Sequence, residues 1–137
     1  MDKLAVELKW SAIALILELI TGHLSIRYIT PETAVFDVGN PLIIGVLAIC
    51  LYLGILFKKQ KYFGGRISFS KAFRTGIIIG FLVAFMQPML YWIIAMVYAN
   101  PPQLGNAGSI IGILLLHILL SPLIAFILKR NKPSEEF

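Results

Sequence analysis

The chain has 137 residues, of which 58% are hydrophobic and only 14% are charged. A soluble globular domain typically carries about 25% charged residues, so this composition excludes an ordinary soluble domain and indicates an integral membrane protein. The net charge of +5 does not indicate a nucleic-acid-binding protein, because the basic residues lie at the ends of apolar segments rather than along one face of a folded domain.

Four apolar segments are each long enough to cross the hydrocarbon core of a bilayer, which takes about 20 helical residues. They are residues 4–24, 38–57, 75–98 and 108–128. The last three contain no charged residue, whereas Glu7, Lys9 and Glu18 interrupt the first. No small-residue cleavage site of a signal peptide follows the first segment, so we expect it to be retained. We therefore predict a single all-α domain over residues 1–137, an integral membrane protein with four transmembrane helices in an up-down bundle.

Basic residues are distributed unequally among the loops, and this distribution predicts the orientation of the chain. The loop between the second and third spans carries six of them: Lys58, Lys59, Lys61, Arg66, Lys71 and Arg74. The loop after the first span carries only Arg27, and the loop at 99–107 carries none. Because Lys and Arg in short loops are retained in the cytoplasm, we expect the middle loop and both termini to be cytoplasmic.

The segment at 58–74 also raises the question of an anionic ligand. Its six basic residues lie where long side chains reach lipid headgroups, and an anionic leaflet attracts them. Gly64 and Gly65 are predicted to end the second helix, and Ser68 or Ser70 to cap the third. The segment lacks the glycine spacing of a phosphate-binding loop. We therefore favour contact with anionic headgroups over a specific ligand site.

A family resemblance lies at the start of the third span. The sequence that begins at Gly64 reads GGRISFSKAFRTGIIIGFLVA and resembles the signature of DUF4199, a bacterial family of small four-span membrane proteins labelled as a domain of unknown function. The residues that fit its pattern are Gly65, Ile67, Ser68, Phe69, Ala72, Phe73 and Gly76. The resemblance implies a multi-pass protein of the bacterial inner membrane and supplies no catalytic residues.

Small and polar residues form one face of the first span. At steps of three and four along this helix lie Glu7, Ser11, Ala14, Glu18, Thr21 and Ser25. Such a face is unfavourable toward lipid, so we expect it to pack on other helices or to face a water-filled cavity. An unpaired carboxylate at the depth of Glu18 would cost several kcal/mol, so we expect this side chain to be protonated or hydrogen bonded.

Small residues also recur in the third and fourth spans, where they allow helices to approach closely. We expect helix packing at Gly76, Gly80, Ala84, Gly108 and Gly112. Prolines mark three further positions in the spans. Pro41 suits the first turn of the second helix, whereas Pro88 and Pro122 fall inside the third and fourth helices and each free a backbone carbonyl.

Three polar residues inside the spans form a candidate proton or polar site: Glu18, Gln87 and His117. His117 lies one residue from the midpoint of the fourth span. We expect it to approach Glu18 if the first and fourth spans are neighbours.

Catalytic motifs are absent from the sequence. It contains no Gly-x-Ser-x-Gly elbow, no His-Glu-x-x-His or Cys-x-x-Cys pair and no dinucleotide fingerprint. Cys50 is the sole cysteine and offers no disulfide. We therefore expect no enzyme activity, no metal site and no cofactor.

Two functions of different classes remain. The first is an interaction or scaffold protein, or an accessory subunit, whose partners are membrane lipids, a second copy or another membrane subunit. The second is a proton-coupled small-molecule transporter that uses Glu18, because LELITG resembles the first-helix glutamate region of the small multidrug resistance exporters. Those exporters form antiparallel dimers, which need balanced loop charge, and the six-to-zero difference between the second and third loops opposes this.

Overall fold

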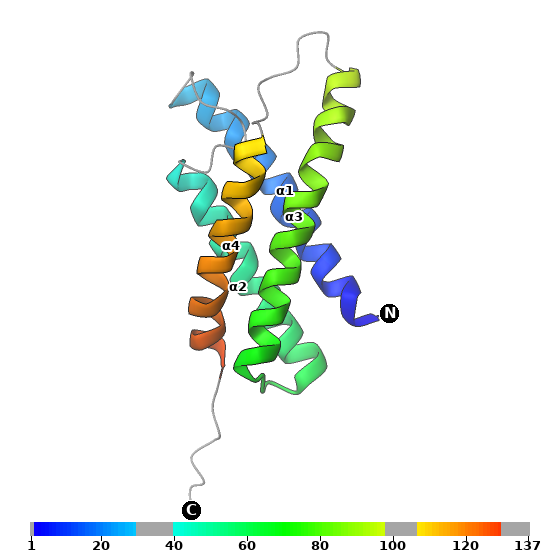
Figure 1. Cartoon of the computed structure of the whole chain (residues 1–137), viewed down its shortest axis with the longest axis vertical. Helices are drawn as coiled ribbons and strands as arrows, with labels where there is room; N and C mark the ends of the chain where they lie inside the picture. The colour runs from blue at the N-terminus through cyan, green and yellow to red at the C-terminus, as the bar shows by residue number, and fades with distance from the viewer. Residues whose placement is uncertain (1, 30–39, 98–106, 130–137) are drawn as a thin grey trace, which may run out of the picture.

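The structure is a computed structural model that describes residues 2–29, 40–97 and 107–129. These residues form four helices: α1 (Asp2–Tyr28), α2 (Pro41–Phe63), α3 (Phe69–Val97) and α4 (Ala107–Leu128). Successive helices run in opposite directions, so that the chain passes up, down, up and down (Figure 1). The predicted all-α up-down bundle is confirmed.

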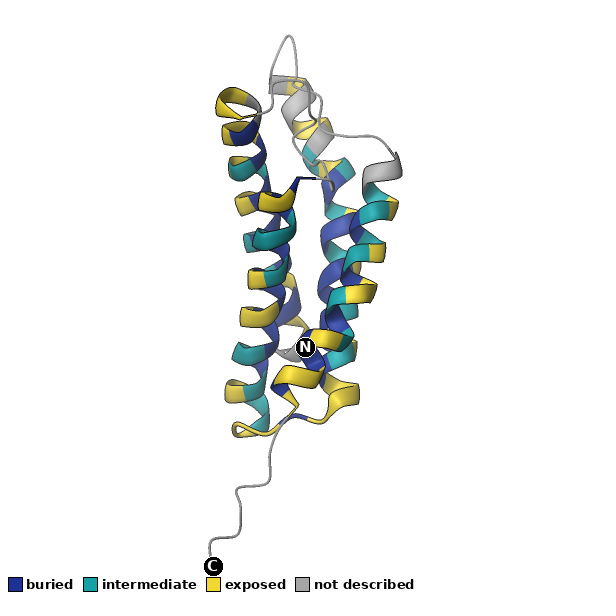
Figure 2. Cartoon of the chain, turned by 90° about the vertical axis from the view of Figure 1, so that its left-hand side faces the viewer, coloured by how far each residue is buried: buried dark blue, intermediate teal, exposed yellow. Residues whose placement is uncertain are grey.

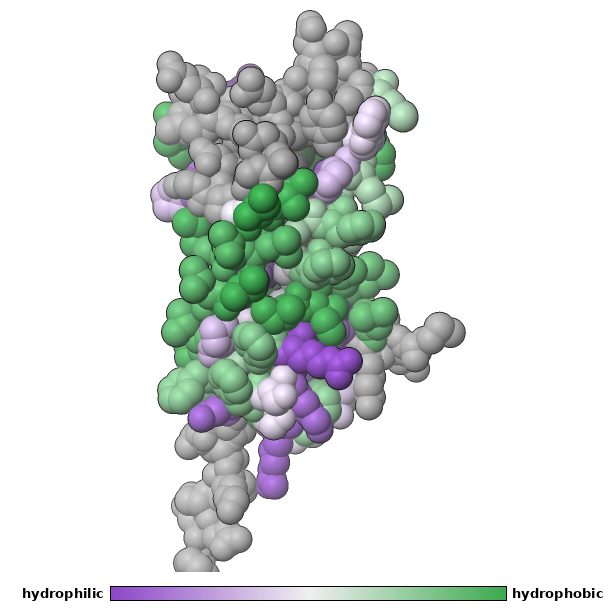
Figure 3. All heavy atoms as spheres, in the orientation of Figure 1, coloured by the Kyte–Doolittle hydropathy of each residue, from purple (hydrophilic) through white to green (hydrophobic). Residues whose placement is uncertain are grey.

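Three of the helices are long and apolar enough to cross a membrane, over Pro41–Phe63, Phe69–Leu90 and Ile110–Leu128. At about 1.5 Å per residue, the 27 residues of α1 also reach across a bilayer, but charged residues such as Glu7 and Glu18 interrupt them. On the face drawn in Figure 3, hydrophobic residues cover the middle of the bundle and strongly hydrophilic ones gather below them. The chain is therefore a membrane protein.

The centre of the bundle is the pair α2 and α3. Among the described residues, α1 packs against both of them, α4 packs against both of them, and α1 and α4 do not contact each other. The buried core includes Leu47 and Leu51 of α2 and Ile79 and Val83 of α3. Buried residues lie on the sides of the helices that face one another (Figure 2).

This arrangement corrects one expectation. Glu18 in α1 and His117 in α4 were expected to approach each other if their helices were neighbours, but α2 and α3 lie between those helices. Loop lengths and hydropathy do not determine which helices of a bundle are adjacent, because that choice depends on how their side chains fit together.

Local signals fix both ends of α2. The side chain of Asn40 accepts a hydrogen bond from the Leu42 N–H at 3.0 Å, and Pro41 occupies the first helical turn as predicted. At the other end, Gly64 and Gly65 have φ angles of 56° and 81°, a left-handed region that favours glycine. The predicted glycine break is confirmed, but the helix ends at Phe63, six residues beyond the predicted end of the span.

The third helix begins directly after this break. Ser68 is the cap, because its Oγ accepts from the Lys71 N–H at 3.4 Å and its carbonyl accepts from the Ala72 N–H at 3.0 Å. The helix is continuous from this cap through the third span, since α3 runs without a break from Phe69 to Val97. Five of the six basic residues of the middle segment therefore lie on the ends of two long helices, and Arg66 lies in the turn between them.

Candidate functional site

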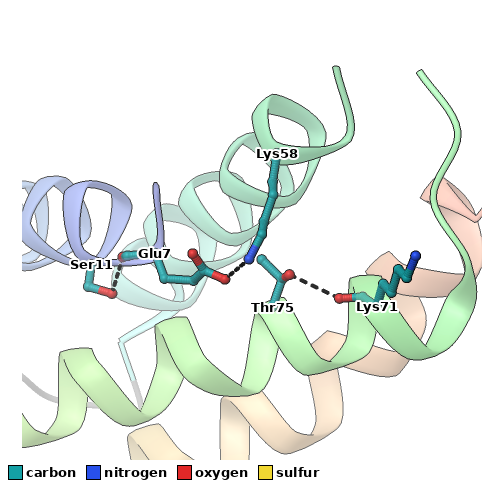
Figure 4. Close-up of polar contacts among 5 residues, drawn as sticks. All are labelled: Glu7, Ser11, Lys58, Lys71 and Thr75. Carbon is teal, nitrogen blue, oxygen red and sulfur yellow. Dashed lines mark hydrogen bonds and ion pairs between the residues drawn. The ribbon is translucent and has the colours of Figure 1, made fainter. Parts of the chain in front are cut away.

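Lys58 and Glu7 form an ion pair that joins α2 to α1 (Figure 4). Because α2 continues as a helix to Phe63, Lys58 lies one helical turn after Gly54 on the buried face of α2. Its side chain therefore points inward. The side chains of Lys58 and Glu7 are 10% and 1% exposed. One carboxylate oxygen of Glu7, Oε1, accepts from the lysine, while Oε2 has no hydrogen-bond partner among the described residues. The structure thus places Lys58 on Glu7, not at the headgroups where we expected it.

A pocket of about 370 Å³ lies beside this ion pair. Its walls come from the first two turns of α1, the last two turns of α2 and the first three turns of α3. The lining residues are Leu4, Glu7, Lys58, Phe63, Lys71, Arg74, Thr75 and Ile78. Three cationic side chains and one carboxylate leave the walls with a formal excess of two positive charges. The pocket is therefore suited to a ligand with at least one anionic group.

Thr75 and Lys71 form the α3 side of the pocket. The Thr75 hydroxyl is buried beside the Glu7–Lys58 pair and donates to the Lys71 carbonyl at 2.9 Å (Figure 4). The Lys71 side chain extends away from the pair and is exposed, with its ammonium 4.8 Å from the centre of the Phe63 ring. Arg74 is also exposed. The deep end of the pocket is consequently fixed by buried contacts, whereas its cationic outer side is accessible.

The other three basic residues of the segment lie outside the pocket. Lys59 is half-buried and donates from Nζ to the carbonyl of Leu128, the last residue of α4, at 3.0 Å. This contact satisfies one of the carbonyls that a helix end leaves unpaired. Lys61 and Arg66 are exposed, and the Lys61 ammonium lies 5.7 Å from the centre of the Phe57 ring.

A second polar contact lies deeper in the bundle. Glu18 is fully buried, and Nε2 of Gln87 donates to its Oε2 at 3.3 Å. Its other oxygen, Oε1, has no hydrogen-bond partner in the described part of the chain. Glu18 is thus hydrogen bonded, as expected, and it joins α1 to α3. Eleven residues separate it from Glu7, which is about 16 Å along the helix.

His117 takes no part in the Glu18–Gln87 contact. Its Nδ1 lies 2.9 Å from the carbonyl of Ile113 in its own helix. A Cβ atom added at Gly80 would overlap its imidazole, and one added at Gly76 would lie 2.9 Å from Cβ of Ser121. The small residues of α3 therefore provide the surface on which His117 and Ser121 of α4 pack.

The remaining residues of the predicted packing set lie in the same two helices. Ala84 is buried in α3, Gly112 is half-buried in α4, and Gly108 belongs to the first turn of α4. Since Gly76 and Gly80 are covered by α4, they serve packing within the chain. In the described ranges, no group of three or more His, Cys, Asp or Glu side chains is placed to hold a metal ion.

Sequence reasoning missed the Glu7–Lys58 pair and the pocket beside it. A signal was present in α2, where buried Leu47, Leu51, Gly54 and Lys58 follow at steps of four, three and four. The apolar run ends at Phe57, so hydropathy indicates that Lys58 lies outside the membrane, whereas the helical spacing indicates that it is the next residue of the buried face.

Comparison with known proteins gives one family match. The family model described as "Protein of unknown function (DUF4199)" matches residues 8–107. This range contains α2, α3 and most of α1. It includes the pocket residues of α2 and α3, whereas Leu4 and Glu7 of α1 lie before it. Neither the curated proteins nor the solved structures include a match to the chain.

Proposed function

Because the chain belongs to the DUF4199 family, whose description gives no activity, we propose a function from its own geometry: an interaction protein or accessory subunit of the bacterial inner membrane. In this proposal all four helices span the membrane, and both termini and the turn at 64–68 are cytoplasmic. Exposed Lys61 and Arg66 then lie among anionic headgroups.

The observation that supports this proposal is that polar residues of α1 contact the neighbouring helices. Three contacts join this helix to its neighbours: Lys58 with Glu7, Ser11 Oγ at 3.2 Å from the Ile79 carbonyl, and Gln87 with Glu18. A fourth joins its last turns to the start of α2, where Nδ2 of Asn40 donates to Oγ of Ser25 at 2.7 Å. The polar face of α1 therefore holds the bundle together, which is the role expected of a structural subunit.

An apolar layer separates the Ser11–Ile79 contact from the Glu18–Gln87 pair. It consists of buried Ala14, Leu51 and Val83, one on each of α1, α2 and α3. A polar path for a transported solute would need continuous polar or hydrated surface through this region. The separated contacts favour an interaction protein over a transporter.

Cross-linking in native membranes, followed by mass spectrometry, tests this function. We expect reproducible links from this chain to a second copy or to one defined membrane protein, at a fixed ratio that survives purification in mild detergent. Links confined to single chains at every cross-linker concentration would contradict the proposal.

A proton-coupled transporter is the second candidate, and one specific observation favours it. Glu18 is a buried acid whose Oε1 has no hydrogen-bond partner among the described residues. Such an oxygen is able to accept a proton or a cationic group that arrives during a transport cycle.

A further inference from the structure

We propose that the pocket between α1, α2 and α3 binds a phosphate ester that carries a primary ammonium group, the chemistry of the phosphatidylethanolamine headgroup. The proposal assigns a ligand to this pocket and holds whether or not the bundle serves as an accessory subunit. It depends on the Glu7–Lys58 pair, on the cationic residues of α3 and on the apolar part of the pocket.

The phosphate is held by the outer, cationic side of the pocket. Lys71 and Arg74 are one turn apart on α3, both line the pocket, and both are exposed. A guanidinium offers several donors in a plane that fits two phosphate oxygens, and an ammonium adds a compact charge. Lys58 cannot be the main phosphate ligand, because its ammonium is already paired with Oε1 of Glu7.

The ammonium is held at the deep end by Glu7. Glu7 lines the pocket, and its Oε2 is buried and has no hydrogen-bond partner among the described residues. Leaving a buried carboxylate oxygen unpaired is unfavourable, and a primary ammonium supplies up to three N–H donors. A ligand with a phosphate alone would leave Oε2 unpaired and would place a second anion near the carboxylate. The ligand must therefore carry a donor as well as an anion.

The size and position of the pocket fit a headgroup that stays attached to its lipid. Its volume of about 370 Å³ lies at the lower end of the range for small-ligand sites, roughly 300–1,000 Å³. Leu4, Phe63 and Ile78 line the part that is not charged, and they provide an apolar surface for the glycerol and the first acyl carbons. The pocket lies at the end of the bundle beside the turn at 64–68, where headgroups meet the apolar core.

The first experiment compares ligands on the purified full chain in detergent. Phosphatidylethanolamine, phosphatidylcholine and phosphatidylglycerol with identical acyl chains are titrated, and bound lipid is measured by native mass spectrometry. We expect phosphatidylethanolamine to bind about tenfold more tightly than the other two, because the choline nitrogen has no N–H donor and the glycerol headgroup has no cation. Equal binding of phosphatidylethanolamine and phosphatidylglycerol would overturn the proposal, because charge attraction alone would then account for it.

Competition with soluble glycerophosphoethanolamine tests whether the ligand is the lipid or a soluble phosphate ester with the same headgroup. If it displaces the lipid at a similar concentration, the pocket serves a soluble phosphate ester. If it fails to compete while the lipid still shows the expected preference, the ligand is the lipid itself. Failure of both ligands to bind more tightly than phosphatidylcholine would overturn the proposal.

A matched pair of variants tests the location of the site. Lys71→Gln with Arg74→Gln removes two charges from the pocket, and we expect phosphatidylethanolamine to bind about tenfold more weakly. Lys9→Gln with Lys129→Gln removes two charges from exposed residues outside the pocket, and binding should change less than twofold. Equal losses in both pairs would overturn the proposal. Because all four side chains are exposed, neither pair of changes removes a buried contact of the fold.

Glu7→Gln tests the ammonium contact separately. The amide keeps the shape of the side chain but removes its charge, so the preference for phosphatidylethanolamine over phosphatidylcholine should fall to less than twofold. An unchanged preference in a folded Glu7→Gln variant would overturn the assignment of the ammonium to this residue. If this variant does not fold, the comparison of lipids on the unchanged protein still decides the proposal.

Discussion

Gly80 of α3 lies directly against the imidazole of His117 of α4, so closely that a methyl group at position 80 would overlap the ring. His117 is buried and its Nδ1 is bound to the Ile113 carbonyl, which limits its freedom to move aside. The absence of a side chain at position 80 is therefore a requirement of the α3–α4 interface.

Gly80→Ala should destabilise the bundle by roughly 1–3 kcal/mol, the usual cost of overpacking a well-packed site. The measurement is thermal unfolding in detergent. Gly45→Ala is the matched control: a Cβ atom at Gly45 meets nothing within 4 Å, so this change should be neutral or stabilising by up to about 1 kcal/mol through helix propensity. If the two variants unfold at the same temperature, the close contact between Gly80 and His117 is wrong.

Removal of one partner of the Glu7–Lys58 pair should cost roughly 3–5 kcal/mol, because the other charge is left buried and unpaired. Lys58→Met and Glu7→Leu test this singly. The double variant should recover much of the loss, since it leaves no unpaired charge. A double-mutant cycle on unfolding in detergent measures the coupling, and Lys61→Met is the control because that side chain is exposed. If the loss of unfolding free energy in the double variant equals the sum of the two single losses, the two residues do not interact.

Glu18→Gln should leave folding and assembly nearly unchanged, within about 1 kcal/mol, because the amide retains a hydrogen bond with Gln87. Unfolding temperature and cross-linking pattern are the measurements. A transporter that uses this residue would instead lose proton release when its substrate binds. Loss of proton-coupled uptake in vesicles, with the bundle still folded, would favour the transporter over the accessory subunit.

Orientation is open to direct labelling. In intact cells, an impermeant thiol reagent should leave Gln60→Cys unmodified and should label Gln103→Cys, because the basic segment near residue 60 is expected in the cytoplasm. Gln103 lies outside the described residues. Cys50 is buried and serves as an internal control that should not react. Equal labelling of both positions would indicate dual orientation and would revive the antiparallel-dimer hypothesis.

The sequence predicts the four helices and the glycine break after α2, but the apolar run stops short of the end of that helix. Apolar length identifies a segment that suits the hydrocarbon core, and it ends at Phe57. The helix continues to Phe63, because backbone hydrogen bonding depends on dihedral angles and stops where Gly64 adopts a left-handed conformation. Hydropathy thus predicts where the membrane ends, whereas glycine predicts where the helix ends.

The candidate site was predictable only in part. The basic residues of 58–74 and the polar face of α1 were both visible in the sequence, and Glu7 was part of that face. The sequence does not show that these two sets of residues lie side by side, because a pocket formed by three helices depends on tertiary packing. The second site was predicted more fully, because the sequence groups Glu18 with Gln87 and His117. The structure brings Gln87 to Glu18, 69 positions away along the chain, whereas His117 packs against Gly80.

The central position of α2 and α3 has a consequence for cooperativity. In the described part of the chain, the outer helices α1 and α4 contact only α2 and α3. A structural change in α1 therefore reaches α4 only through α2 and α3. The two outer helices nevertheless share α3 as a partner: Ser11 of α1 contacts the Ile79 carbonyl, and the next residue, Gly80, packs on His117 of α4. Residues with shared partners are energetically coupled, so loosening of one outer helix reaches the other through this turn of α3.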